Sequence, residues 1–241
     1  MTVGTHGDWT TAPFVALDLE GSGAQDRGGE AILEIAVVPF TAGQPDIAAA
    51  YSTLVNPGRT IPRRQWISPG LTTAALSTAP SPTDIEPELA RRVNGHVIVG
   101  HNVGVDWRLL HRRHPTIAPM ALIDTLRLAR RLKLSAKNSL SDLTAQLQLT
   151  SQVERLAAGS QPHRALWDTV ATALLLPALI TRGWPTGATL AALFEAAAVD
   201  LSTGRAQPST GPTQETLFAP LAAAPADASR ALKDNSSGGE T

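Results

Sequence analysis

Asp18 and Glu20 are two carboxylates separated by one residue, at the end of an apolar run that begins at Phe14. A proline before the run and glycines after it are typical of a buried strand. Because side chains alternate along a strand, both carboxylates point to the same side. Neighbouring carboxylates repel each other and are costly to desolvate, and a divalent cation offsets both costs. Mg2+ and Mn2+ bind oxygen ligands, so the pair predicts part of a metal site.

Two later segments supply further groups of the same chemical kind. Asp106 lies in the first turn of a predicted helix, after an apolar run and the polar pair His101-Asn102. Asp168 lies five residues after His163, near the start of a strongly apolar predicted helix. The chain therefore offers carboxylates and a histidine from three separate segments for one site.

Each of these residues also has a plainer interpretation. Asp18 and Glu20 could be a solvated pair at a strand end, and Asp106 could complement a helix N-terminus. Asp168 could be a surface helix residue, and His163 a capping or surface histidine. Taken together, the three segments favour the metal site.

The polar pair after the fourth predicted strand has two open interpretations. His101 and Asn102 either contact a substrate or form a structural turn, and we favour the substrate contact. Asp124 is predicted to be only an N-cap. The basic residues within 108–113 and 127–133 have an even chance of being no more than solvated helix faces.

Hydrophobic periodicity and turn residues predict the elements that must position these side chains. Three apolar runs joined by short polar links favour an antiparallel meander, and the second half alternates strands with helices. This order implies an α/β fold with a mixed sheet and helices on its faces. The predicted strands are 14–20, 31–40, 48–55, 96–100 and 120–123. The predicted helices are 72–76, 83–93, 103–114, 124–134, 139–147, 163–179 and 189–197, and residues 152–162 are predicted to form a loop.

Length and composition limit the classes of protein that this chain can belong to. It has 241 residues, a formal net charge of −1 and no cysteine. Disulfides, zinc thiolate sites and thiol nucleophiles are therefore excluded, and the charge does not fit a protein that coats duplex DNA. We expect a polar lead-in over residues 1–12, one domain over 13–199 and a disordered tail over 200–241. No signal peptide or membrane-spanning run is apparent, so we expect a cytoplasmic protein.

The order of the motifs resembles the DEDDh family of 3′-to-5′ exonucleases, which includes the proofreading epsilon subunit of bacterial DNA polymerase III and stand-alone relatives. The matching motifs are Asp-x-Glu, His-Asn with a downstream Asp, and His-x4-Asp. The resemblance implies a ribonuclease H-like fold with a five-stranded mixed sheet. It also implies that Asp18, Glu20, Asp106 and Asp168 bind two Mg2+ or Mn2+ ions and that His163 is the general base.

The same resemblance implies a reaction and a place for the substrate. Gly21 and Ser22 stand where the family often has Thr-Thr or Thr-Gly against the terminal nucleotide, so selectivity is expected to depend on them. The implied reaction hydrolyses DNA from single-stranded or frayed 3′ ends to nucleoside 5′-monophosphates, in replication proofreading or repair. The alternatives are trimming of RNA 3′ ends and, in another class, a non-catalytic adaptor between a polymerase and a sliding clamp.

The C-terminal segment contains one short motif, Gln-Glu-Thr-Leu-Phe over residues 214–218. It resembles the bacterial sliding-clamp-binding motif, in which a Leu-Phe pair fills an apolar pocket and Gln donates a directional hydrogen bond. Gln214, Leu217 and Phe218 are therefore expected to bind a clamp, and the alternative is a chance match in a low-complexity segment. A DNA polymerase is a further expected partner, and a membrane is not.

Overall fold

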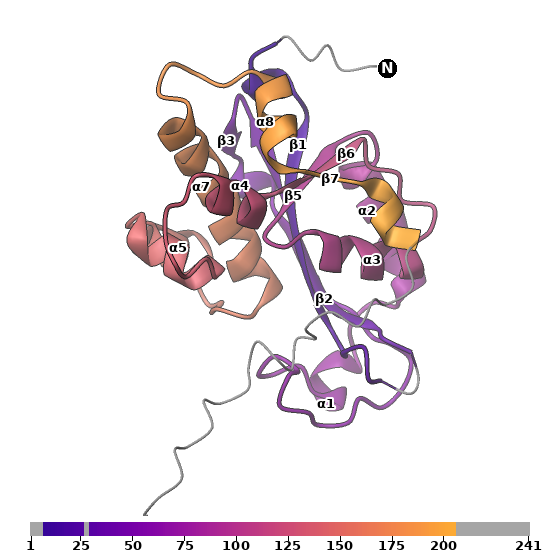
Figure 1. Cartoon of the computed structure of the whole chain (residues 1–241). Coiled ribbons are helices and arrows are strands. Elements are labelled where there is room, and N and C mark those ends of the chain that lie inside the picture. Colours follow the sequence, from indigo (N-terminus) through magenta and orange to yellow (C-terminus); the bar gives the residue numbers. More distant parts are fainter. Residues whose placement is uncertain (1–6, 27–28, 206–241) are drawn as a thin grey trace, which may run out of the picture. The chain divides into compact units, whose positions relative to one another are not determined.

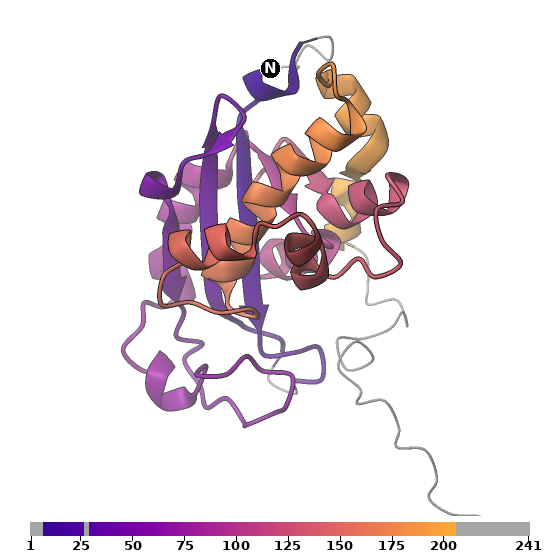
Figure 2. The same ribbon diagram turned by 90° about the vertical axis from the view of Figure 1, so that its left-hand side faces the viewer.

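The computed structural model describes residues 7–26 and 29–205, which form one α/β unit. Helices cover both faces of a mixed sheet, as Figures 1 and 2 show. The strands are β1 (Phe14–Gly21), β2 (Ile32–Thr41), β3 (Gln44–Pro45), β4 (Tyr51–Leu54), β5 (Val97–Gly100), β6 (Ala121–Asp124) and β7 (Ala198–Val199). The α-helices are α1 (Thr73–Leu76), α2 (Pro82–Val93), α3 (Gly104–Arg113), α4 (Thr125–Arg131), α5 (Leu140–Gln146), α6 (Thr150–Leu156), α7 (Ala165–Gly183) and α8 (Leu190–Ala197). Short 3-10 helices are η1 (Trp9–Thr11), η2 (Ile47–Ala49) and η3 (Leu201–Arg205).

β1 is a central strand of the sheet. It pairs antiparallel with β2 and parallel with β5, and β6 continues the parallel part beyond β5. β3 and β4 pair antiparallel with different stretches of β2. At the opposite edge of the sheet, β7 pairs antiparallel with β6. The predicted meander and the predicted mixed sheet are therefore both present, and all five predicted strands are found. The two-residue strands β3 and β7 extend the sheet to seven strands.

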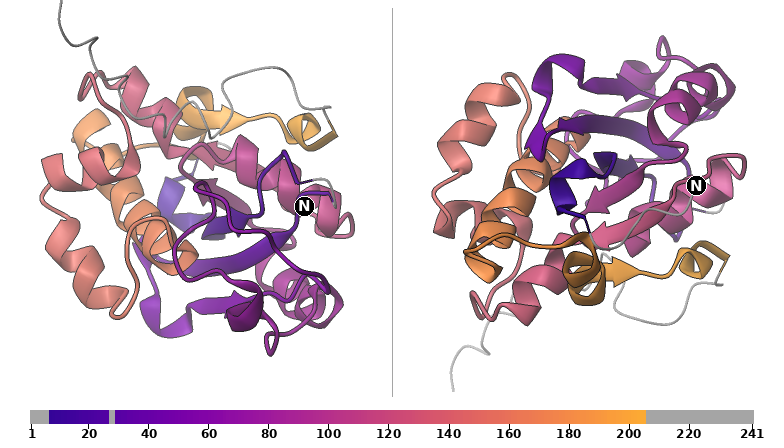
Figure 3. Two further views of the ribbon diagram at one scale, coloured as in Figure 1. Left: turned by 90° about the horizontal axis from the view of Figure 1, so that it is seen from below. Right: turned by 90° about the horizontal axis from the view of Figure 1, so that it is seen from above.

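The alternation of side chains along β1 decides which residues face which layer. Val15, Leu17 and Leu19 pack in one core cluster with residues of α2 and α3. Phe14 and Ala16 pack in clusters on the other face, with residues of α4, α5, α7 and α8. Figure 3 shows the two helical layers on either side of the sheet. Even-numbered β1 residues therefore face the layer that contains α7.

One predicted loop is wrong, because residues 150–156 form the helix α6. Val153 and Ala157 are buried against α7, and Leu149 packs beside them. Their spacing of four residues was the available signal for a helix. Leu149 provides no side-chain cap, so the sequence has no N-terminal signal for this helix.

Packed residues extend beyond both predicted ends of the domain. Trp9 lies in the segment predicted as a lead-in, yet it is buried and its ring lies 5.8 Å from that of Phe14. Leu201 lies in the segment predicted as a tail, yet its carbonyl accepts a 2.8 Å hydrogen bond from the Trp107 indole. Within the described residues, the packed region therefore runs from η1 to η3.

Helix α7 is the long apolar element that crosses the sheet in Figure 2. Among the described helices, it is the one with the length and hydropathy of a candidate membrane span. Of that span, 67% is buried inside the fold. A core helix of an α/β domain has the same properties, because it is covered by the sheet and by neighbouring helices.

Candidate metal centre

Three of the predicted ligands come together at the carboxyl end of β1. Asp18 and Glu20 lie on the β1 face that packs against α7, and Asp168 lies in the first turn of α7. One carboxylate oxygen from each residue lies within 4.8 Å of the others. Because side chains alternate along β1, Asp18 and Glu20 point to the same face of the strand. On that face they meet Asp168.

Asp106 approaches the same place from α3. Its Oδ1 accepts a hydrogen bond from the Leu19 backbone N–H at 3.4 Å, and its side chain is buried. Leu19 lies between the two β1 carboxylates, so Asp106 is held beside both. Its charge contributes to raising the pKa of Asp18. The fourth predicted ligand thus borders the cluster of the other three.

The pKa values of the four clustered carboxylates are all raised, which reflects the energetic cost of bringing buried negative charges together. Burial raises the pKa of Asp18 well above its ordinary value, and the charges of Asp106 and Asp168 raise it further. Burial raises the pKa of Glu20 to about 8, although a hydrogen bond from Ser68 opposes the shift. Burial also raises the pKa of Asp106 and the pKa of Asp168, each to about 7. This oxygen-only donor set fits a hard divalent cation, which would neutralise the carboxylates.

The sequence reasoning missed a fifth carboxylate, Glu34 of β2. Glu34 lies directly across the β1–β2 ladder from Glu20 and is 5% exposed. Its two oxygens accept hydrogen bonds from Arg164 Nε at 2.7 Å and Arg164 Nη2 at 2.9 Å. The signal in the sequence was a single charged residue inside the second apolar run. A buried charge of that kind requires a partner, and the sequence alone did not identify it.

The Glu34–Arg164 pair anchors the start of α7. No local side chain caps this helix, but the backbone N–H of Ala165 donates to Glu34 Oε2 at 3.3 Å. A residue of β2 therefore supplies the cap that α7 lacks. His163 directly precedes this anchor, and Asp168 follows it by one turn.

His163, the predicted general base, is exposed and has a left-handed backbone with φ of 64°. A hydrogen bond from its backbone lowers the pKa of Asp168 in opposition to burial. The histidine is therefore attached to the carboxylate cluster through its main chain. Its exposure leaves the imidazole accessible to a substrate at the cluster.

Gly21 and Ser22, the predicted substrate contacts, lie directly after the cluster. The β1–β2 register shifts between Glu20 and Gly21, so the strand is irregular at this point. A Cβ on Gly21 would lie 3.0 Å from Leu109 Cδ2, so the chain passes close to α3. Ser22 is buried, and its hydroxyl accepts a 2.8 Å hydrogen bond from the Ala31 backbone N–H. The Ser22 side chain thus holds its own loop together.

The contacts of His101 favour the structural turn over the substrate contact. One ring nitrogen is 3.0 Å from Thr125 Oγ1 and the other is 2.9 Å from the Asn138 carbonyl. Burial lowers the pKa of His101, which favours the neutral ring in these contacts. Asn102 has φ of 68° and an exposed side chain, and its backbone N–H donates to Asp124 Oδ1.

Asp124 caps α4, as predicted. Its Oδ1 accepts a hydrogen bond from the Leu126 backbone N–H at 2.9 Å. The same oxygen accepts the Asn102 N–H, so one carboxylate fixes both the turn after β5 and the start of α4.

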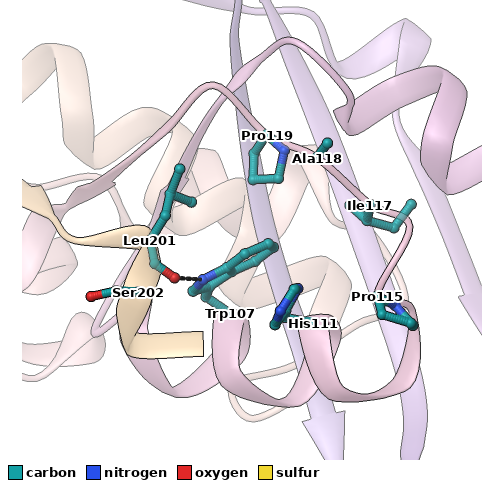
Figure 4. A pocket seen from close by; sticks show the side chains of 8 residues that line it. All are labelled: Trp107, His111, Pro115, Ile117, Ala118, Pro119, Leu201 and Ser202. Carbon is teal, nitrogen blue, oxygen red and sulfur yellow. Dashed lines mark hydrogen bonds between the residues drawn. The ribbon is translucent and has the colours of Figure 1, made fainter. Parts of the chain in front are cut away.

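A separate pocket of about 450 Å3 lies beside α3, as Figure 4 shows. Trp107 and His111 of α3 line it, and Leu201 of η3 lies beside Trp107. None of the carboxylates described above lines this pocket. It is therefore distinct from the candidate metal centre.

Comparison with known proteins identifies the family. The profile of the exonuclease family RNase_T matches residues 15–176, so the chain belongs to this family of exonucleases. The family resemblance found in the sequence is thus confirmed. The matched region contains all four predicted ligands and His163.

Individual relatives agree with this assignment. A DNA polymerase III subunit epsilon-like protein of Rhodobacter capsulatus is 36% identical over 181 residues, which are 72% of this chain and 25% of the relative. The DNA polymerase III subunit epsilon of Aquifex aeolicus is 28% identical over 182 residues, 71% of this chain and 82% of the relative. The chain therefore spans a quarter of the length of the first protein and most of the second.

A solved structure extends the similarity to the fold. Exonuclease X in complex with 5′-overhanging duplex DNA aligns with a TM-score of 0.57 and 28% identity. The alignment covers 76% of this chain and 98% of that structure. The ribonuclease H-like fold implied by the sequence motifs is thereby confirmed.

Proposed function

We propose that this chain is a divalent-metal-dependent 3′-to-5′ exonuclease that releases nucleoside 5′-monophosphates from DNA. The observation that carries the proposal is the oxygen cluster of Asp18, Glu20 and Asp168, with Asp106 at its border. Divalent cations would neutralise these buried carboxylates, and an exonuclease uses such cations at a phosphodiester.

The proposed roles follow from the position of each residue. Asp18, Glu20, Asp106 and Asp168 would hold two Mg2+ or Mn2+ ions, which neutralise charge at the scissile phosphate and acidify a water when bound. His163 accepts the proton of the attacking water. The water oxygen bonds to phosphorus while the bond between phosphorus and the 3′ oxygen breaks, and that oxygen takes a proton from solvent and leaves as a hydroxyl.

DNA is the proposed substrate, with a single-stranded or frayed 3′ end. The proposal is supported by the epsilon-type relatives and by the structure of exonuclease X, which is a complex with 5′-overhanging duplex DNA. The second candidate is trimming of RNA 3′ ends. We propose a cytoplasmic role in replication proofreading or repair.

A digestion assay tests the activity. A 5′-labelled single-stranded DNA oligonucleotide with Mg2+ should yield a ladder of shortened products and mononucleotides, and a chelator should stop the reaction. Asp18→Ala should abolish it, because one side of the ligand cluster is lost. Undiminished hydrolysis by Asp18→Ala would contradict the assignment of Asp18 to the metal site. If the wild type hydrolyses nothing with Mg2+ or Mn2+, the non-catalytic adaptor is favoured instead. A matched RNA oligonucleotide that is digested faster than the DNA would favour the RNA alternative.

We further propose that residues 214–218 bind a sliding clamp and that a DNA polymerase is a second partner. Gln214, Leu217 and Phe218 lie outside the described residues, so this proposal rests on the sequence motif alone. Calorimetric titration of the full chain with a bacterial clamp tests it. The double variant Leu217→Ala/Phe218→Ala should lose binding, and unchanged affinity would contradict the motif assignment.

A further inference from the structure

The segment between β4 and α1 is attached to the candidate metal centre at two points. Ser68 Oγ donates a 2.5 Å hydrogen bond to Glu20 Oε2, one of the clustered carboxylates. Trp66 Nε1 donates to the Ser22 carbonyl at 3.3 Å, two residues beyond Glu20. Figures 1 and 2 show that the chain around α1 lies at the end of the sheet where β1 runs into the loop that leads to β2. The Trp66 indole is therefore fixed to the loop that directly follows the β1 carboxylates.

Gly23 makes this placement of the indole possible. It has φ of +90°, and a Cβ there would lie 2.3 Å from Trp66 Nε1 and 2.8 Å from Trp66 Cδ1. Real Cβ atoms do not approach other atoms so closely, so any larger residue would displace the ring. The close approach of the two segments thus depends on a residue without a side chain.

Two exposed arginines lie close to the indole in the chain. Arg63 and Arg64 are exposed, and neither forms an ion pair with a described residue. The Arg64 guanidinium carbon lies 5.8 Å from the centroid of the Trp66 ring. By contrast, Arg59 of the same segment is bonded to Asp26 at 2.5 Å. A half-buried indole and two unpaired cations therefore stand beside a strongly acidic site.

We propose that Trp66, Arg63 and Arg64 bind the single-stranded nucleic acid whose 3′ end enters the carboxylate cluster. The indole stacks on an unpaired base, and the guanidinium groups contact phosphates that the metal ions do not reach. Stacking on an aromatic side chain tolerates any base, and phosphate contacts are independent of sequence. The surface is therefore suited to a single strand of any sequence. This inference rests on the proposed exonuclease function and specifies the strand that the site accepts.

A binding measurement without turnover tests the surface separately from the activity. Fluorescence anisotropy of a fluorescein-labelled ten-nucleotide oligothymidylate, with Ca2+ in place of Mg2+, gives a Kd for each variant. Trp66→Ala should raise this Kd about tenfold, because a base loses its stacking partner. Arg63→Ala/Arg64→Ala should raise it by a similar factor and reduce its dependence on salt. Arg182→Ala removes an exposed arginine at the far end of α7 and should leave the Kd unchanged.

Two further variants separate stacking from loss of structure. Trp66→Phe keeps an aromatic face and should retain most of the affinity, whereas Gly23→Ala should weaken binding as Trp66→Ala does, because the new Cβ displaces the indole. Each variant is first shown to keep the wild-type far-UV spectrum and melting temperature to within a few degrees. If folded Trp66→Ala and the double arginine variant both bind as the wild type does, the inference is overturned. If the wild type binds the oligonucleotide through Trp66 but never hydrolyses it, the binding surface stands and the proposed exonuclease activity fails.

Discussion

The acidic side chains at the end of β1 are the most strongly perturbed groups of the described chain. Burial and mutual repulsion raise the pKa values of Asp18, Glu20, Asp106 and Asp168. In the folded, metal-free protein these groups keep protons that the unfolded chain releases at an ordinary pKa of about 4. Folding and metal binding are therefore both linked to proton binding at this site.

The first prediction concerns the pH dependence of stability. Between about pH 4 and pH 8 the metal-free native state holds more protons than the unfolded state, so its stability falls as pH rises. The melting temperature in the presence of chelator should thus be lower at pH 8 than at pH 6. Glu20→Gln, which removes one of the charges, should reduce this slope. Saturating Mg2+ should remove most of the slope, because the cations replace the protons, and a chelated protein with equal stability at both pH values would contradict the prediction.

The second prediction separates His163 from the carboxylates. His163→Ala should reduce the rate of DNA hydrolysis by about a hundredfold, the usual contribution of a general base. The rise in melting temperature on adding Mg2+ should remain, since the ligand cluster is intact. His96→Ala, which changes a histidine whose side chain bonds to the Asn94 carbonyl, serves as the control and should keep the wild-type rate. A loss of the Mg2+-induced shift in His163→Ala would instead assign the histidine to the metal site.

At the scale of elements, the site depends on how β1, β2, α3 and α7 meet. β1 carries two carboxylates, α3 brings Asp106 to the backbone of Leu19, and α7 brings Asp168. β2 holds the start of α7 through the Glu34–Arg164 pair. The geometry of the cluster is thus set by contacts between elements that are distant in sequence.

The third prediction tests the anchor of α7. Arg164→Ala leaves the buried Glu34 without its charged partner and should destabilise the protein by about 1–3 kcal/mol in urea denaturation. The Mg2+ concentration needed for half of the thermal shift should also increase, because Asp168 is no longer held in place. Arg91→Ala breaks an exposed ion pair with Glu88 and should cost less than about 0.5 kcal/mol. Equal stability of both variants would show that the Glu34–Arg164 pair does not anchor the helix.

At the scale of the whole molecule, the packed region continues past the domain boundary predicted at residue 199. Leu201 accepts the hydrogen bond of the buried Trp107 indole, and together they line the pocket beside α3. Removing η3 would expose Trp107 and leave its indole N–H without a protein acceptor.

The fourth prediction compares two truncations of the chain. A chain that ends at residue 209 should keep the melting temperature of the full chain, because every described packing contact is retained. A chain that ends at residue 199 should lose about 1–3 kcal/mol, because apolar surface of Trp107 becomes exposed to water and its N–H loses the Leu201 acceptor. Differential scanning calorimetry measures both, and equal melting temperatures would place the boundary at 199 as the sequence suggested.

The amino-acid sequence by itself determined the strands, most of the helices and the order of the acidic motifs. These features are local: apolar alternation defines β1, and apolar spacing and caps define helices such as α2 and α4. The family resemblance could be recognised for the same reason, since each motif lies within a few residues of chain.

Only the tertiary structure decided which side chains meet. It paired Glu34 with Arg164 across 130 residues, occupied both nitrogens of His101, and placed Trp66 and Ser68 against the end of β1. No local pattern encodes such contacts, because they depend on strand register and on the packing of helices against the sheet. The candidate ligands could therefore be proposed from the sequence, whereas their anchors and the proposed strand-binding surface required the fold.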